Sequence, residues 1–417
     1  MRPSSRAINY RPPQSIDLVM QMLICMFIAM VLSTEAVAQT TSPENPESDP
    51  ISDYLEAIEA TEAERSAYST ELSDLYFGLG KSHFSKREYE RARRAYQRGM
   101  QIERVNYGLN SLSQTPYLLS IADAESFLGN WEESQDALEN IYTINSQAYG
   151  ETDPRMLPVL DELLDWYLDT YKERTRNGAY QNLVMSERLG NRISNILKTH
   201  SLVNDPDAAL RYRKISHLHY FIANHIKQYG EPSDSGFTIN SGATTNSPTS
   251  TSHLHYQRGK AALKKVIESL EQQPNSSAAE KAEAVAELGD WYLVFGQRMS
   301  ASKAYKLAFQ TLLATSESQQ QSEALFDQPS IIEFTALDEG QGRQESPQQD
   351  LQVAMTVTKT GMPIKMEILN PPESITKAEI RSILKDIRSK RFRPKLVEGI
   401  TTESSIVFPY SSNQTQG

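Results

Sequence analysis

The chain has 417 residues, with 42 basic and 53 acidic side chains and a formal charge of −11. Its length allows two or three domains. The negative balance excludes general nucleic-acid binding, which needs basic side chains to displace counterions from phosphates. The single cysteine, Cys25, excludes an intramolecular disulfide.

The first 38 residues have the pattern of a secretory signal peptide. Three arginines precede an apolar run of 15 residues, 18–32, and Ala-Val-Ala at 36–38 is typical of a cleavage site. A membrane-spanning helix needs about 20 apolar residues. We therefore expect cleavage between Ala38 and Gln39 and a mature chain in the periplasm of a Gram-negative cell. The alternative is an uncleaved anchor in the inner membrane with the chain facing the periplasm.

The expected mature chain is acidic and begins with a tether. Cleavage would remove Cys25 and leave 39 basic and 51 acidic residues, a formal charge of −12. Residues 39–50 are polar and contain three prolines. A segment with so little to bury predicts disorder.

Residues 51–230 have the spacing of paired helices. Small residues at Gly80 and Ala92 stand where two backbones would approach, and aromatic residues stand between them. Residues 127–134 have the composition of a turn between two helices. Tyr107-Gly108 and Tyr149-Gly150 recur 42 residues apart, so we predict repeated helical units.

These residues resemble the tetratricopeptide repeat, and the 42-residue period resembles its kinesin-light-chain variety. The resemblance implies an α-solenoid with a concave groove for a peptide or helix. Candidate groove residues are Asn106, Tyr107 and Asn145. The third unit begins at Pro154 and is followed by about 30 extra residues that do not fit the period.

Two polar segments divide the rest of the chain. Residues 231–252 predict a flexible linker, and residues 253–315 predict a degenerate repeat around Leu288-Gly-Asp-Trp-Tyr292. Residues 316–347 predict a second linker, in which 331–334 would suit a short strand. Two short sequences are duplicated: Asp-Trp-Tyr-Leu at 165 and 290, and Ser-His-Leu-His-Tyr at 216 and 252.

Residues 348–410 predict a small α+β module, followed by a tail at 411–417. Apolar residues alternate on both sides of a turn at Gly361, which is typical of a β-hairpin. Thr376 suits the start of a helix, and a last strand carries Ile406 and Phe408. The fold class is therefore mainly α, a TPR-like solenoid, with a C-terminal β-β-α-β module.

This module resembles the C-terminal domain of TonB-type energy transducers. The match is most specific at Arg391-Phe392-Arg393-Pro394, followed by Gly399. The resemblance implies contact with an outer-membrane receptor or envelope complex, in which a partner strand adds to an exposed sheet edge at 403–408. The implied partner-binding residues are Arg391, Phe392, Arg393, Pro394, Ser404, Ile406 and Phe408.

We expect no enzyme activity, no cofactor and no metal site. The sequence has no Gly-x-Ser-x-Gly elbow, phosphate loop or dinucleotide fingerprint. The acidic residues around Asp161 and Asp165 predict a solvated helix face. Five histidines between 217 and 255 predict surface or groove positions, with a metal shared between two helices as the minor alternative. Basic residues at 385–395 predict a solvated face, or a contact with an acidic peptide or lipid headgroup.

The sequence therefore predicts a periplasmic scaffold that binds protein or peptide partners and no nucleic acid. The alternative is a membrane-anchored, TonB-like energy transducer that takes part in outer-membrane transport, and only an uncleaved N-terminal segment would contact the membrane. Deletion of residues 346–417 is expected to leave the helical repeats folded.

Overall fold

The structure is a computed structural model that describes residues 49–173, 179–230, 248–313, 325–334, 351–372 and 375–410. The expected signal peptide, its cleavage site at Ala38 and Gln39, residues 39–48 of the tether and the tail at 411–417 lie outside these ranges. None of the described helices is long and apolar enough to cross a membrane.

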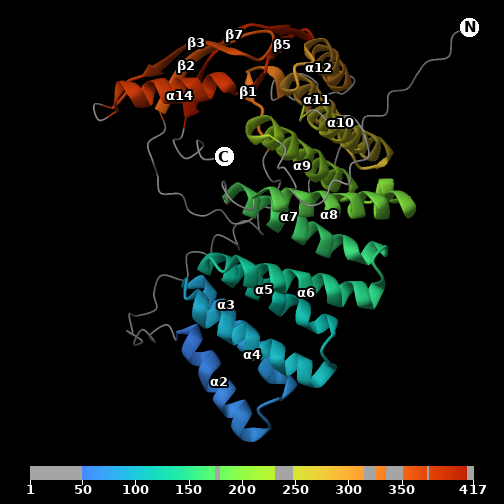
Figure 1. The fold of residues 1–417 in the computed structure, drawn as a ribbon, viewed down its shortest axis with the longest axis vertical. Coiled ribbons are helices and arrows are strands. Elements are labelled where there is room, and N and C mark those ends of the chain that lie inside the picture. Colours follow the sequence, from blue (N-terminus) through green and yellow to red (C-terminus); the bar gives the residue numbers. More distant parts are fainter. Residues whose placement is uncertain are drawn as a thin grey trace, which may run out of the picture.

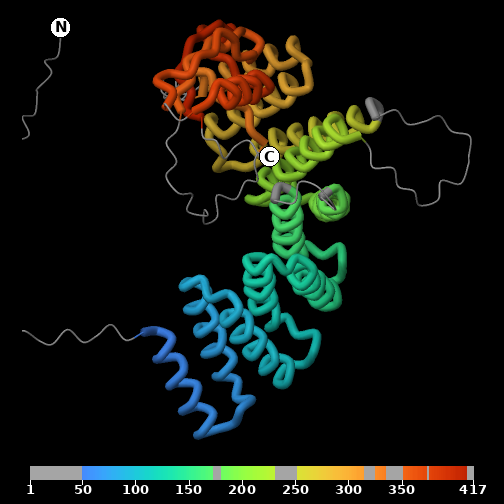
Figure 2. The backbone as a smooth tube through the Cα atoms, turned by 60° about the vertical axis from the view of Figure 1, so that its left-hand side comes forward, coloured from blue at the N-terminus to red at the C-terminus, as the bar shows by residue number. Residues whose placement is uncertain are grey.

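Most described residues form a stack of antiparallel helix pairs, and a small α+β module lies at one end of the stack (Figure 1). Helix α2 (Pro50–Glu64) lies at the opposite end. The helix axes rotate progressively along the stack (Figure 2). The pairs are α3 (Thr70–Ser85) with α4 (Tyr89–Tyr107), α5 (Thr115–Leu128) with α6 (Trp131–Tyr149), α7 (Leu157–Glu173) with α8 (Ala179–Thr199), α9 (Ala208–Tyr229) with α10 (Pro248–Gln272), and α11 (Ala278–Val294) with α12 (Arg298–Leu313).

Small residues allow aromatic rings to pack inside the helix pairs. Gly80 on α3 faces the ring of Tyr96 on α4, and Gly289 on α11 faces the ring of Tyr305 on α12. A Cβ atom at either glycine would overlap the ring. Both contacts join residues that are 16 positions apart, and Ala92 is fully buried. The prediction that Gly80 and Ala92 lie where two helices approach is confirmed. The first and last helix pairs share the same glycine–tyrosine contact.

Glycines end several helices. The Tyr-Gly pairs expected to mark the repeat period end α4 and α6, with φ angles of 94° at Gly108 and 90° at Gly150, and a further glycine, Gly230, ends α9 with a φ angle of 80°. Gly129, in the expected turn at 127–134, ends α5 in the left-handed conformation. Glycine is favoured there because it has no Cβ atom to clash.

The middle of the stack differs from the predicted division. Helix α10 begins at Pro248, within the expected linker, and packs along α9. Leu218, Ile222, Leu263 and Val266 are each at most 2% exposed. Residues 231–247 therefore connect two helices of one pair, not two domains. The residues that did not fit the period form α8 and α9, which continue the stack.

The C-terminal module has one helix packed on a three-stranded antiparallel sheet. The sheet order is β3 (Pro363–Leu369), β2 (Leu351–Val357), β7 (Ser404–Tyr410), and α14 (Lys377–Ser389) buries Ile383 and Ile387 against it. Thr376 begins α14 with a reciprocal capping box to Glu379. In the chain, β2 and β3 precede α14, and β7 follows it. Three short strands that were not expected lie between α14 and β7: β4 (Phe392–Arg393), β5 (Lys395–Val397) and β6 (Ile400–Thr402).

Residues 325–334 lie in the expected second linker, and they pack against both parts of the molecule. Phe326 is 1% exposed and its ring centroid lies 6.3 Å from that of Tyr305. Phe334 packs on Trp291, at 5.6 Å between ring centroids. Between them, β1 (Ser330–Ile331) pairs with β4 of the module. This segment ties the module to the helices, and its strand, Ser330–Ile331, shares only residue 331 with the predicted strand at 331–334.

Candidate protein-binding site

The last strand, β7, lies at an edge of the module's sheet. It pairs with β2 along its whole length, from Ser404 opposite Val357 to Tyr410 opposite Leu351. Within the described residues no strand pairs with its other side. An unpaired edge presents backbone N–H and C=O groups that a further strand can bind. The edge expected from the resemblance is therefore present as a geometric feature.

Side chains alternate across β7. Ile406 and Phe408 are partly buried against the module's core, on the side where α14 packs. Val407, between them, is 55% exposed. Of the predicted contact residues on this strand, Ser404, Ile406 and Phe408 thus share one face and point toward the core. An added strand would meet mainly the backbone of β7.

The predicted contact residues at 391–394 lie between the module and the helices. Phe392 is fully buried, and its ring lies 5.6 Å from that of Phe408. Pro394 is also buried. Arg391 is half-buried and donates to the backbone carbonyls of Lys390 and Ser389. This segment is held within the protein along most of its length.

Arg393 crosses from the module to α11. Its Nε donates to Asp290 Oδ1 at 3.1 Å, and its Nη2 donates to the other oxygen of the same carboxylate. Tyr305 of α12 donates to Asp290 Oδ1 at 2.8 Å. The Arg393 and Asp290 side chains are 11% and 9% exposed. Burial opposes the charged guanidinium, but Asp290 raises the pKa of Arg393 above its usual value. Burial, followed by Asp290, raises the pKa of Tyr305.

The basic residues at 385–395 do not form one free patch. Lys395 pairs with Asp327 at 3.0 Å, and Lys390 lies 3.8 Å from Asp386. Lys385 and Arg388 remain exposed on α14. Because part of the positive charge is neutralised internally, this cluster is a weaker candidate for binding than the β7 edge.

The helical stack has an apolar cavity of about 170 Å³ between its second and third pairs. Leu119, Leu138 and Leu163 contribute to its lining. Two candidate groove residues are engaged with backbone: Asn106 donates to Tyr68 O and Ile102 O, and Asn145 donates to Ile141 O, each at 2.9 Å. Tyr107 is 59% exposed.

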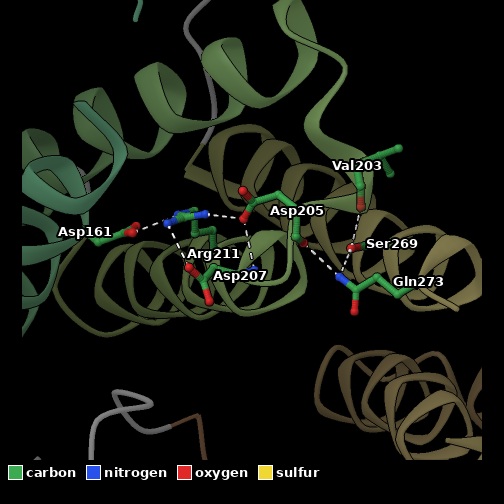
Figure 3. Close-up of polar contacts among 7 residues, drawn as sticks. All are labelled: Asp161, Val203, Asp205, Asp207, Arg211, Ser269 and Gln273. Atoms are coloured by element: carbon green, nitrogen blue, oxygen red, sulfur yellow. Dashed lines mark hydrogen bonds and ion pairs between the residues drawn. The ribbon is translucent and has the colours of Figure 1, made fainter. Parts of the chain in front are cut away.

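The acidic residues expected on a solvated face form internal ion pairs. Asp161 accepts from Arg211 Nε at 2.8 Å, and Asp165 pairs with Lys214, which joins α7 to α9. Figure 3 shows Arg211 also reaching Asp205 and Asp207, while Gln273 and Ser269 hold the backbone of the same turn. The solvated-face interpretation was wrong for Asp161 and Asp165, because their pairing residues on α9 are about 50 positions away in the sequence, whereas Glu162 and Asp169 are exposed as expected.

Two of the five histidines meet in the interior. His219 on α9 and His255 on α10 are each 4% exposed, and their Nδ1 atoms are 3.1 Å apart. Glu187 on α8 completes a group whose potential ligand atoms all lie within 4.8 Å of one another. The expected surface or groove position is wrong for this pair. His253 is exposed, as expected.

Sequence reasoning missed the residues that attach the module to the helices. Asp290 and Phe334 are the main examples, since each contacts residues distant in sequence. The duplicated Asp-Trp-Tyr-Leu had singled out Asp290, but nothing nearby in the sequence indicates Arg393 as its partner.

No known protein family matches the sequence, and no curated protein matches it. Among solved structures, the chain is similar to BtubC (BKLC) from P. vanneervenii, at 12% identity and a TM-score of 0.41, over 64% of this chain and 90% of that one. It is also similar to two structures of a Podosopora anserina putative kinesin light chain with nearly identical TPR-like repeats, one of which carries a point substitution. Each has 15% identity and a TM-score of 0.39, over 59% of this chain and 98% of that one. The repeat-like character of the helix pairs rests on the Gly80–Tyr96 and Gly289–Tyr305 contacts.

Proposed function

We propose that this protein is a protein-binding scaffold whose C-terminal module accepts a partner strand along the edge of β7. The observation that carries the proposal is the pairing of β7 on one side only, within the described residues. Backbone pairing supplies affinity in strand addition, and pockets for alternate side chains supply selectivity. Binding, not catalysis, is therefore the proposed role.

The orientation of the β7 backbone supports this use of the edge. Pro409 has no N–H group, and proline is found on edge strands at positions where the N–H would point away from the neighbouring strand, which here is β2. Backbone N–H groups two residues apart in a strand point to the same side. The N–H groups of Ser405 and Val407 are therefore expected to face the free edge, where a partner strand would accept from them.

The helical stack would supply a second binding surface. Stacked helix pairs present long surfaces that fit extended or helical peptides. The apolar cavity between α5, α6 and α7 would receive a bulky apolar side chain of such a peptide. In this scheme one chain brings two partners together.

We further propose that the scaffold acts in the periplasm, after cleavage at Ala38, and that its partners belong to the outer membrane or the cell envelope. The support is the signal-like sequence of residues 1–38 and the TonB-like order of the module's long elements. N-terminal sequencing of the mature chain is expected to begin at Gln39. An intact N-terminus in the membrane fraction would favour the alternative, an anchored energy transducer.

The β7 edge is tested by photo-crosslinking in living cells. A photoreactive amino acid at Ser405 is expected to capture a partner, and one at Glu367 on the opposite edge strand is the control. Val407→Pro removes one edge donor and should abolish capture, because the partner loses a backbone hydrogen bond. Val407→Ala keeps the N–H and should retain it. Equal capture by the two Val407 variants, with unchanged circular dichroism, would exclude strand addition at β7.

A further inference from the structure

Three consecutive helices bring potential metal ligands to one point in the stack. Glu187 lies on α8, His219 on α9 and His255 on α10. The two Nδ1 atoms are 3.1 Å apart, and His255 Nδ1 lies 4.0 Å from Glu187 Oε1. Tetrahedral zinc with bonds of about 2.0–2.1 Å places its donor atoms roughly 3.4 Å apart. The spacing of the imidazoles is close to that value.

The two histidines occupy the same position in a duplicated sequence. Ser-His-Leu-His-Tyr runs from Ser216 to Tyr220 on α9 and from Ser252 to Tyr256 on α10, and the second histidine of each copy enters the pair. The first histidines, His217 and His253, do not belong to the cluster. The antiparallel packing of α9 on α10 therefore brings together equivalent residues of the two copies.

The environment favours the neutral imidazoles that bind metals. Burial is the main cause that lowers the pKa of His219 to about 3, with smaller effects from His255 and Arg258. Burial, followed by Arg258, lowers the pKa of His255 to about 4. Both rings are thus uncharged at neutral pH. The proton between the two Nδ1 atoms would have to move to an Nε2 atom before both Nδ1 atoms could bind a metal.

Arg258 is the competing cation at this site. It pairs with Glu187 Oε1, the oxygen that also lies nearest to His255, and its side chain is 43% exposed. A bound dication would repel the guanidinium, which has solvent to move into. The 24% exposure of Glu187 provides access from the same side, while both imidazoles are buried.

We propose that Glu187, His219 and His255 bind a divalent transition-metal ion, with Zn²⁺ as the expected ion. Two imidazoles and one carboxylate are a ligand set that zinc commonly takes, and water would fill the fourth position. The ion would join α8, α9 and α10 through one side chain of each helix. This inference is independent of the β7 edge.

The test is titration of Zn²⁺ into the full-length mature chain, prepared without a histidine tag and treated with a chelator. One Zn²⁺ per chain should bind, and it should raise the melting temperature. His219→Ala and His255→Ala should each weaken binding by at least about 10–100-fold, the loss seen when even an indirect partner of a metal ligand is removed. His253→Ala is the matched control from the same duplicated sequence and should bind as the wild type does.

Two further variants keep the proposal testable if the histidine variants fold poorly. Glu187 lies at the more exposed side of the site, and Glu187→Gln should weaken Zn²⁺ binding. Arg258→Gln removes the competing cation and should tighten it. Absence of stoichiometric Zn²⁺ binding would show that the histidines form a hydrogen-bonded pair only and would overturn the proposal. An equal loss in His253→Ala and His219→Ala would also overturn it.

Discussion

The contact between Arg393 and Asp290 shows how a single residue can have a different role from the one its motif implies. Arg393 belongs to the segment that resembles a partner-binding motif, and it makes a bidentate ion pair within the chain. Tyr305 donates to the same carboxylate. A guanidinium engaged in this way holds the module on the helices, because a buried charge that loses its partner is strongly destabilising.

Asp290→Ala should therefore destabilise the protein by about 3–5 kcal/mol, since it leaves Arg393 buried without a counter-charge. Urea unfolding followed by circular dichroism measures the change. Asp327→Ala is the control, because it breaks the exposed pair with Lys395 and should cost at most about 1 kcal/mol. Similar losses in the two variants would contradict the structural role of the buried pair.

The buried histidines predict a pH dependence of stability. Their pKa values are lowered in the folded chain, so the unfolded chain binds more protons once the pH falls below about 6.5. Stability should thus fall as the pH decreases from about 6.5 toward 4, by up to about 1.4 kcal/mol per pH unit for each histidine. Above about pH 7 both histidines are neutral in the folded and the unfolded chain, so they cause no further change in stability with pH.

Urea unfolding of chelator-treated protein at pH 7 and pH 5 measures this dependence. His255→Asn should reduce the difference between the two pH values relative to the wild type. His253→Asn, at an exposed position, should leave it unchanged. An identical pH dependence in the wild type and His255→Asn would exclude a neutral, buried His255.

At the scale of elements, the features that depend on the local sequence were predicted better than the pairing of elements with one another. Glycines at helix ends and small residues inside helix pairs were recognisable because their requirements are local: a positive φ angle, or a close approach within one pair. The three long strands and the capped helix of the module were predicted for the same reason, whereas the three short strands were not. The pairing of α9 with α10 was not, because a polar stretch between helices has the same composition as one between domains.

Gly80→Ala tests how closely helix α3 packs on the Tyr96 ring of α4. The added methyl group should push against the Tyr96 ring, at a cost of about 1–3 kcal/mol for overpacking. A gain of about 0.5–1 kcal/mol in helix propensity offsets part of it. Gly190→Ala is the control, because its nearest neighbour is a flexible Leu218 methyl at 3.2 Å. We expect thermal unfolding to show Gly80→Ala as the less stable of the two variants.

At the scale of the whole molecule, the module and the end of the stack form one unit. Leu396 of the module belongs to the same buried cluster as Val285 and Tyr305 of α11 and α12. Phe334 and Phe326 extend that contact along the connecting segment. These contacts join residues far apart in the sequence, and no local pattern indicates them. The candidate edge was expected only from the resemblance at 391–399, and the contacts that support the module rigidly on the helices were not expected at all.

The contacts between the module and the helices change the expected result of deleting residues 346–417. The sequence predicts that the helical repeats remain folded, whereas the structure predicts local loss of stability at α11 and α12, where Leu396 and Arg393 are removed. Hydrogen exchange should show reduced protection in these helices and unchanged protection in α3–α6, toward the other end of the stack (Figure 1). Uniform protection along the truncated stack would show that the docking contacts contribute little.

The ion pair between Arg393 and Asp290 also has a mechanical consequence. A partner that pulls on β7 would load β2 through their shared hydrogen bonds. The load would leave the module through contacts that include the ion pair of Arg393 with Asp290 on α11, the short β1–β4 pairing and the packing of Leu396. Tension would therefore enter the helical stack at a fixed point and in a fixed direction. A freely hinged module would turn to follow the pull, whereas this one would transmit the force to α11 without first reorienting.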